Sequence, residues 1–139
     1  MRAWEAVGDG TPLHAVDREP PVPEADEVLV EVAACGVCRT DLHVVAGELA
    51  PHRPRVVPGH EVVGRVVSAG ASVSRFAVGD RVGVPWLRRT CGECRWCRTG
   101  RENLCPRSTY TGWDHDGGYA ELVTVPAAFA YRIPAVFDD

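Results

Sequence analysis

The stretch Cys91-Gly92-Glu93-Cys94-Arg95-Trp96-Cys97, followed by Asn103-Leu104-Cys105, places four cysteines close together in the chain. Four thiolates are the number that a tetrahedral structural zinc ion requires, and a closed sulfur shell leaves no open position for catalysis. Disulfides are the alternative, but they suit small secreted chains, and these cysteines are too local to connect distant segments. The spacing therefore predicts a structural zinc lobe at about residues 91–105, with Cys91, Cys94, Cys97 and Cys105 as ligands.

The composition around this lobe predicts a single cytoplasmic domain, residues 1–139. An apolar content of 45% is enough to bury one core. The chain has no apolar run of membrane-spanning length and no basic-then-apolar N-terminal pattern, so no membrane partner is expected. A net charge of −4 and a pI near 5.7 give no general attraction to nucleic acid, and no nucleic-acid partner is expected.

Short β-branched runs separated by turns indicate a mainly-β fold. The 11 prolines and 14 glycines argue against long helices. One short helix is predicted from Cys38 to Ala46, where Gly47 stops it. Four strands are predicted, at residues 28–34, 62–68, 81–84 and 118–125.

A second group of possible metal ligands lies upstream of the lobe, in the segments 36–43 and 58–64. Cys38 and His60 could both bind zinc, and a sulfur and imidazole shell with a vacant position is typical of catalytic sites. Asp41 is a candidate to orient the second ring nitrogen of the histidine. From the residues alone, a buried thiol and a hydrogen-bonded core histidine explain the pair at least as well.

Several blocks of the chain occur in the order found in one enzyme family. Gly59-His60-Glu61, followed by Gly64, Gly70 and Val73, has the form of a zinc signature, and residues 36–43, 76–82, 91–105 and 117–121 add further blocks. Together they resemble the zinc-dependent alcohol dehydrogenases of the medium-chain dehydrogenase/reductase superfamily, over essentially the whole chain. The resemblance implies a GroES-like catalytic domain, which is a partly open β-barrel with short helices and a four-cysteine zinc lobe.

The resemblance also implies what the upstream group does. Cys38 and His60 match two of the three protein ligands of a catalytic zinc ion, and Glu61 lies in the shell around them, able to approach the metal. The implied activity is oxidation of an alcohol to an aldehyde or ketone by hydride transfer to NAD or NADP. The residues present do not select the alcohol or the cofactor. The full enzyme is expected to be a homo-oligomer.

Three further positions match family roles outside the metal shell. Thr40 matches the hydroxyl that receives the alcohol proton, and His43 matches the histidine that passes it to solvent by way of the cofactor ribose. Arg39 matches the contact to the cofactor pyrophosphate, which suits a guanidinium group. Cys35 forms a Cys-x-x-Cys pair with Cys38, but the resemblance implies a small buried side chain there and neither a ligand nor a redox thiol.

No Gly-x-Gly-x-x-Gly motif follows a strand in the 139 residues. The cofactor-binding Rossmann domain and the third zinc ligand are therefore expected outside this chain, and the chain alone is expected to be inactive. Two alternatives stay open: a stand-alone, non-catalytic zinc-binding GroES-like module, and a zinc-ribbon-like nucleic-acid binder suggested by the lobe arginines. The acidic chain and the absence of two separated Cys-x-x-Cys pairs argue against the second.

Overall fold

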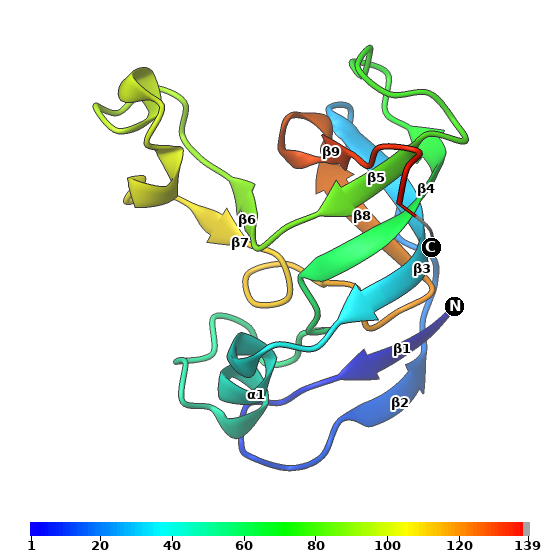
Figure 1. The fold of residues 1–139 in the computed structure, drawn as a ribbon. Coiled ribbons are helices and arrows are strands. Elements are labelled where there is room, and N and C mark those ends of the chain that lie inside the picture. Colours follow the sequence, from blue (N-terminus) through cyan, green and yellow to red (C-terminus); the bar gives the residue numbers. More distant parts are fainter. Residues whose placement is uncertain (138–139) are drawn as a thin grey trace.

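The computed structural model, which describes residues 1–137, is built around a central antiparallel sheet (Figure 1). Its five strands are arranged in the order β8-β3-β4-β5-β9. Valine side chains from four of these strands, joined by Phe76, pack into the main core. The strands are β3 (Glu27–Gly36), β4 (Glu61–Ala69), β5 (Arg81–Val84), β8 (Leu122–Pro126) and β9 (Tyr131–Arg132).

Strand β3 bends because its register with β4 shifts twice, between Leu29 and Val30 and between Val32 and Ala34. Such bulges increase the local twist of a sheet. Within residues 1–137 the two edge strands, β8 and β9, do not pair with each other, so the sheet curves but stays open. The mainly-β, partly open architecture predicted from the sequence is confirmed.

The predicted strand 118–125 begins later than expected, at Leu122. The preceding residues bond to irregular backbone instead, because the N–H groups of Gly118 and Tyr119 donate to the carbonyls of Gly59 and Pro58. The other three predicted strands agree with β3, β4 and β5. The N-terminal hairpin was not predicted; it consists of β1 (Arg2–Glu5) and β2 (His14–Asp17).

The single α-helix in the described chain, α1, spans Arg39–Ala46 and confirms the predicted helix to within one residue. Cys38 is its N-cap: the thiol accepts a hydrogen bond from the Thr40 N–H, and the Asp41 carboxylate accepts one from the Cys38 N–H. Gly47 ends the helix with φ at 72°, a left-handed conformation that favours glycine. No helix among residues 1–137 is long and apolar enough to cross a membrane.

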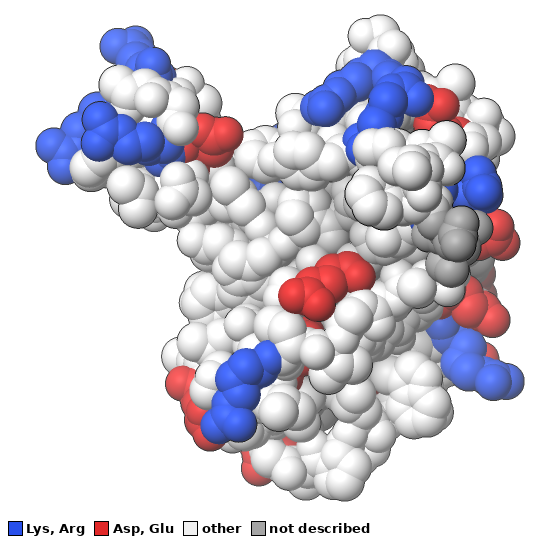
Figure 2. All heavy atoms as spheres, in the orientation of Figure 1, with Lys and Arg blue, Asp and Glu red and all other residues white. Residues whose placement is uncertain are grey.

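The four-cysteine lobe projects from the body on a two-stranded stem (Figure 1). Basic side chains gather on it (Figure 2), among them the exposed Arg98. The guanidinium groups of Arg95 and Arg101 lie 4.2 and 5.6 Å from the ring centre of Trp96. The stem strands are β6 (Leu87–Arg89) and β7 (Thr109–Tyr110), and the short 3₁₀ turns are η1 (Cys97–Thr99), η2 (Glu102–Leu104) and, after β8, η3 (Ala127–Phe129).

A buried ion pair connects the stem of the lobe to the central sheet. Arg88 on β6 is 3% exposed, and its Nη2 donates to Glu27 Oε1 at 2.7 Å. The same guanidinium donates to the carbonyl and hydroxyl oxygens of Thr124 on β8. Burial lowers the pKa of Arg88, but an arginine remains charged at neutral pH. The contact therefore holds two full charges away from water.

Replacing Arg88 by alanine should destabilise the protein by about 3–5 kcal/mol, because the buried Glu27 carboxylate then loses its nearest cation. That carboxylate keeps the Glu24 N–H at 3.3 Å and the more distant Arg89 guanidinium at 3.9 Å. The free energy of unfolding from urea titration measures the effect. The control is Arg98→Ala, an exposed arginine on the same lobe, which should change stability by no more than about 0.5 kcal/mol. Equal stability of the two variants would show that the buried pair contributes little.

Candidate metal centre

The four lobe cysteines form a cluster in which all sulfur atoms lie within 4.8 Å of one another. The Cys94–Cys97 and Cys91–Cys105 sulfur pairs are each 3.5 Å apart, and the Cys91–Cys97 pair is 3.9 Å apart. Zinc–sulfur bonds of about 2.3 Å in a tetrahedron require sulfur pairs about 3.8 Å apart. A disulfide would need about 2.05 Å, and all the cysteines are free thiols. The cluster fits a tetrahedral zinc ion.

Backbone and side-chain donors around this cluster favour thiolates. The N–H groups of Glu93 and Cys94 lower the pKa of the Cys91 thiol to about 6. The N–H groups of Cys91 and Arg107 donate to Cys105 Sγ at 3.5 and 3.4 Å. The Arg107 guanidinium interacts with the Cys91 sulfur and donates to the Glu93 carboxylate. These contacts offset the negative charge that four thiolates bring to a divalent ion.

A second donor cluster consists of Cys38, Asp41 and His60. Cys38 is the N-cap of α1, and His60 directly precedes β4, so the tertiary fold brings the helix start to the strand start. Cys38 Sγ and His60 Nε2 are 3.2 Å apart. Around a tetrahedral zinc ion, sulfur and nitrogen ligands lie about 3.5 Å apart. The two side chains therefore fit a shared metal ion.

Asp41 contacts both of these side chains or their neighbouring backbone. Its side chain is almost completely buried; Oδ2 accepts the Cys38 N–H at 2.9 Å, and Oδ1 accepts the Gly59 N–H at 3.0 Å. Oδ1 also lies 3.2 Å from His60 Nδ1 as an ion-pair contact, so Asp41 faces that ring nitrogen, although Nδ1 neither donates nor accepts a hydrogen bond within residues 1–137. With Nδ1 facing the carboxylate and Nε2 facing Cys38 Sγ, Nε2 is the nitrogen that remains for a metal.

The charges in this cluster stabilise one another. Burial lowers the pKa of His60, but its contacts with Asp41 and Cys38 outweigh that effect and raise it. Burial raises the pKa of Asp41, but His60 and the N–H groups of Cys38 and Gly59 lower it overall. The Thr40 side chain is the main cause of a lowered pKa of the Cys38 thiol. The cluster therefore favours a thiolate and a carboxylate, the forms that accompany a bound cation.

Glycines allow the segment before His60 to pack against residues 117–119. A Cβ on Gly117 would lie 2.0 Å from the Gly59 carbonyl oxygen, and a Cβ on Gly118 would lie 2.9 Å from the Cys35 sulfur. Gly59 itself has φ at 95°, and a Cβ there would lie 2.7 Å from the Tyr119 ring. This close backbone packing holds the Gly59 N–H against Asp41 and so positions His60.

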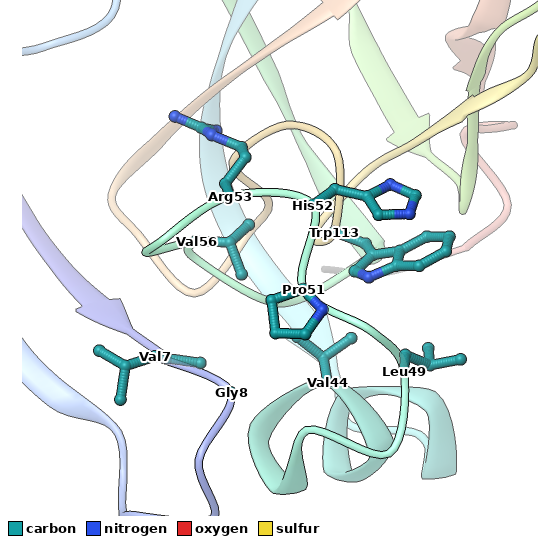
Figure 3. Close-up of a pocket in the computed structure, with 10 residues that line it drawn as sticks. Val7, Gly8, Val44, Leu49, Pro51, His52, Arg53, Val56 and Trp113 are labelled. Atoms are coloured by element: carbon teal, nitrogen blue, oxygen red, sulfur yellow. The ribbon is translucent and has the colours of Figure 1, made fainter.

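Aromatic side chains form a wall beside His60. The Trp86 ring contacts His60 edge-on at a centroid distance of 4.8 Å and stacks on Tyr110, also at 4.8 Å. Trp113 lies parallel to Trp86 at 6.0 Å and stacks on His52 at 3.9 Å, as Figure 3 shows for the last pair. Trp86 therefore lies directly against His60, one of the two candidate metal ligands.

The remaining predicted residues lie around the Cys38–His60 pair. Thr40 and His43 are half-buried and are one helical turn apart on α1, whereas Arg39 is exposed. Glu61 is exposed at the start of β4, and its carboxylate packs over Gly36, outside the cluster of Cys38, Asp41 and His60.

Cys35 is not part of the metal cluster, although it belongs to the Cys-x-x-Cys pair. It is half-buried, its thiol contacts the Gly36 carbonyl, and burial raises its pKa to about 11. A thiol with such a pKa is a poor nucleophile and a poor ligand. The prediction of a buried, non-ligand side chain agrees with this environment.

Two contacts near the site were not predicted. The Glu48 carboxylate bonds to His43 Nδ1, and the Asp114 carboxylate bonds to the exposed His52 at Nδ1, at 2.6 Å. For Glu48, the glycine before it was the available signal, because a helix that ends at a left-handed glycine folds the next residue back over its last turn.

Comparison with known proteins agrees with this arrangement. Residues 24–135 match the family model of the alcohol dehydrogenase GroES-like domain. The probable alcohol dehydrogenase AdhA of Mycobacterium tuberculosis is 55% identical over 100% of this chain, and an alcohol dehydrogenase of Geobacillus stearothermophilus is 49% identical over 91% of it. The chain spans only 43% and 38% of the length of these two relatives.

Solved structures show the same similarity. A cobalt- and zinc-bound thermostable alcohol dehydrogenase from Pyrobaculum aerophilum superposes with a TM-score of 0.88 at 38% identity, covering 97% of this chain and 41% of that one. An alcohol dehydrogenase from E. coli CFT073, complexed with NADH, has a TM-score of 0.89 at 34% identity, covering 100% of this chain and 40% of that one.

Proposed function

Because this chain belongs to the alcohol dehydrogenase GroES-like domain family, we propose that it is the metal-binding catalytic domain of a zinc-dependent alcohol dehydrogenase. The enzyme would oxidise an alcohol to an aldehyde or ketone, with NAD or NADP as the hydride acceptor. The cofactor would be bound mainly by a dinucleotide-binding domain outside residues 1–139, where the third protein ligand of the catalytic zinc ion would also lie. A homo-oligomeric state and a cytoplasmic location belong to the same proposal.

The observation that carries this proposal is the geometry of Cys38, Asp41 and His60. Two side chains of the chemistry that zinc requires lie 3.2 Å apart, and one buried carboxylate contacts the Cys38 N–H and the His60 ring. This donor set also weighs against a non-catalytic zinc module, since an incomplete sulfur and imidazole shell leaves positions for a substrate. The lobe cluster, with four sulfurs, would hold the structural zinc ion.

Zinc bound at Cys38 and His60 would supply a Lewis acid that makes the hydroxyl of an adjacent alcohol more acidic. Thr40, on α1, follows Cys38 by two residues, and its hydroxyl would accept the proton that leaves this alcohol. His43, one turn further along α1, would pass the proton to solvent, and the exposed Arg39 would contact the cofactor pyrophosphate. Trp86 and its aromatic neighbours would exclude water from one side of the site.

The test uses the whole enzyme, meaning this chain joined to its dinucleotide-binding domain. Appearance of reduced nicotinamide with simple primary and aromatic alcohols should be abolished by Cys38→Ala, because the sulfur ligand is lost. Cys35→Ala, in the same Cys-x-x-Cys pair, should retain turnover, since that thiol lies outside the cluster. Undiminished turnover of Cys38→Ala would refute the proposed catalytic metal site.

A further inference from the structure

The chain folds back over the last turn of α1 and brings an acidic side chain to His43. The N–H groups of Glu48 and Leu49 donate to the His43 carbonyl oxygen at 3.0 and 3.3 Å, directly after the left-handed Gly47. This turn places the Glu48 carboxylate in a hydrogen bond with His43 Nδ1. Both side chains are accessible to solvent, with exposed fractions of 58% for Glu48 and 36% for His43.

The carboxylate decides which ring nitrogen of a neutral His43 carries the proton. An ionised carboxylate is only an acceptor, so the nitrogen it contacts must be the donor. With hydrogen on Nδ1, the lone pair of the neutral ring lies on Nε2, on the opposite side of the imidazole. The opposite tautomer would point a lone pair at Glu48 and leave Nε2 unable to accept a proton.

We propose that Glu48 is a positioning residue that holds His43 in the tautomer with hydrogen on Nδ1, so that Nε2 is the proton acceptor. The consequence for the reaction rests on the proposed role of His43 in carrying the alcohol proton to solvent. When Nε2 accepts that proton, the ring becomes a cation beside the Glu48 carboxylate, and release of the same proton restores the neutral tautomer. Glu48 itself exchanges no proton and touches no substrate.

The chain contains a matched control for this contact. His52, in the loop that follows α1, makes the same kind of bond, from Nδ1 to the Asp114 carboxylate at 2.6 Å. Its ring differs from that of His43 in being stacked on Trp113 (Figure 3). Changing Glu48 should therefore affect the tautomer of His43 alone, and changing Asp114 should affect that of His52 alone.

Nitrogen-15 NMR of the imidazole groups, recorded on this chain at about pH 8 where free histidine is neutral, tests the tautomer directly. The wild-type His43 should have hydrogen mainly on Nδ1. In Glu48→Ala the ratio of the Nδ1–H to the Nε2–H form should fall roughly two- to fivefold, the range expected for an exposed pair. The ratio in Glu48→Gln should lie between those of the wild type and Glu48→Ala, because the amide oxygen still accepts a hydrogen bond. Asp114→Ala should leave the tautomer ratio of His43 unchanged. An unchanged ratio in Glu48→Ala would overturn the proposal.

Turnover of the whole enzyme separates this inference from the proposed function. Glu48→Ala should lower turnover by about the factor seen in the tautomer ratio, without loss of zinc, and Glu48→Gln should restore part of it. A shifted tautomer with unchanged turnover in Glu48→Ala would overturn the positioning role. If His43→Gln also had full turnover, the proposed proton path through His43 would be refuted together with the positioning role of Glu48. The assignment of the metal site would not be affected.

Discussion

Replacing Thr40 by alanine should lower turnover of the whole enzyme by roughly two to four orders of magnitude while zinc content stays unchanged. The size is the usual contribution of a positioned proton-transfer group, because the hydroxyl proposed to accept the alcohol proton is removed. The variant loses the Thr40 side-chain contact that lowers the pKa of the Cys38 thiol, but zinc should be retained because the donor atoms of Cys38 and His60 remain and metal binding itself favours the thiolate. The Thr40 N–H, which bonds to Cys38 Sγ at 3.2 Å, is also present in the variant.

The measurement pairs turnover with zinc per chain for each variant. Thr40→Ser should keep most of the activity, since its hydroxyl survives at the same position. His43→Gln should be milder than Thr40→Ala near neutral pH, because water can replace a half-exposed group at the outer end of the path. Loss of zinc in Thr40→Ala, or undiminished turnover, would show that Thr40 only supports the start of α1.

Replacing Cys97 by serine should remove the firmly bound zinc ion of the lobe. We expect about one zinc ion per chain to survive mild chelation, since only the lobe provides a complete sulfur shell. Cys97 Sγ lies within 3.9 Å of both Cys91 and Cys94 sulfurs, so its loss opens the shell on two sides. Elemental analysis should find retained zinc near zero, and proteases should cut the loosened lobe faster because metal binding there contributes to folding.

The control for this change is Cys35→Ser, which removes a thiol outside both donor clusters. It should keep the full complement of lobe zinc. If Cys97→Ser retained as much zinc as Cys35→Ser after the same chelation, Cys97 would not be a ligand.

Features that depend on neighbours along the chain were predictable from the sequence. The four cysteines lie within one short segment, so their spacing alone indicated the cluster that the structure shows. The helix at Arg39–Ala46 was predicted because its stop signal, Gly47, is local. Strands β3, β4 and β5 were predicted from β-branched runs between turns, because valine-rich segments favour the strand conformation and their side chains pack into the core of the sheet.

Contacts between distant segments could not be predicted in the same way. The expected strand 118–125 was shortened because Gly118 and Tyr119 bond to Gly59 and Pro58, a pairing that no local propensity encodes. The buried Arg88–Glu27 pair joins residues far apart in the chain, and neither residue carries a motif. Likewise, from spacing alone, Cys38 and His60 could equally have been an isolated thiol and an isolated histidine.

The sequence by itself therefore determined the lobe cluster, the short helix and the valine-rich strands, because each depends on residues that are close along the chain. Only the tertiary structure decided that Asp41 contacts Cys38 as well as the expected His60, that Trp86 packs on His60, and that Glu48 reaches His43. The physical reason is that hydrogen bonds and ring contacts act over a few ångströms of space. Whether two side chains come that close depends on the path of the whole backbone between them.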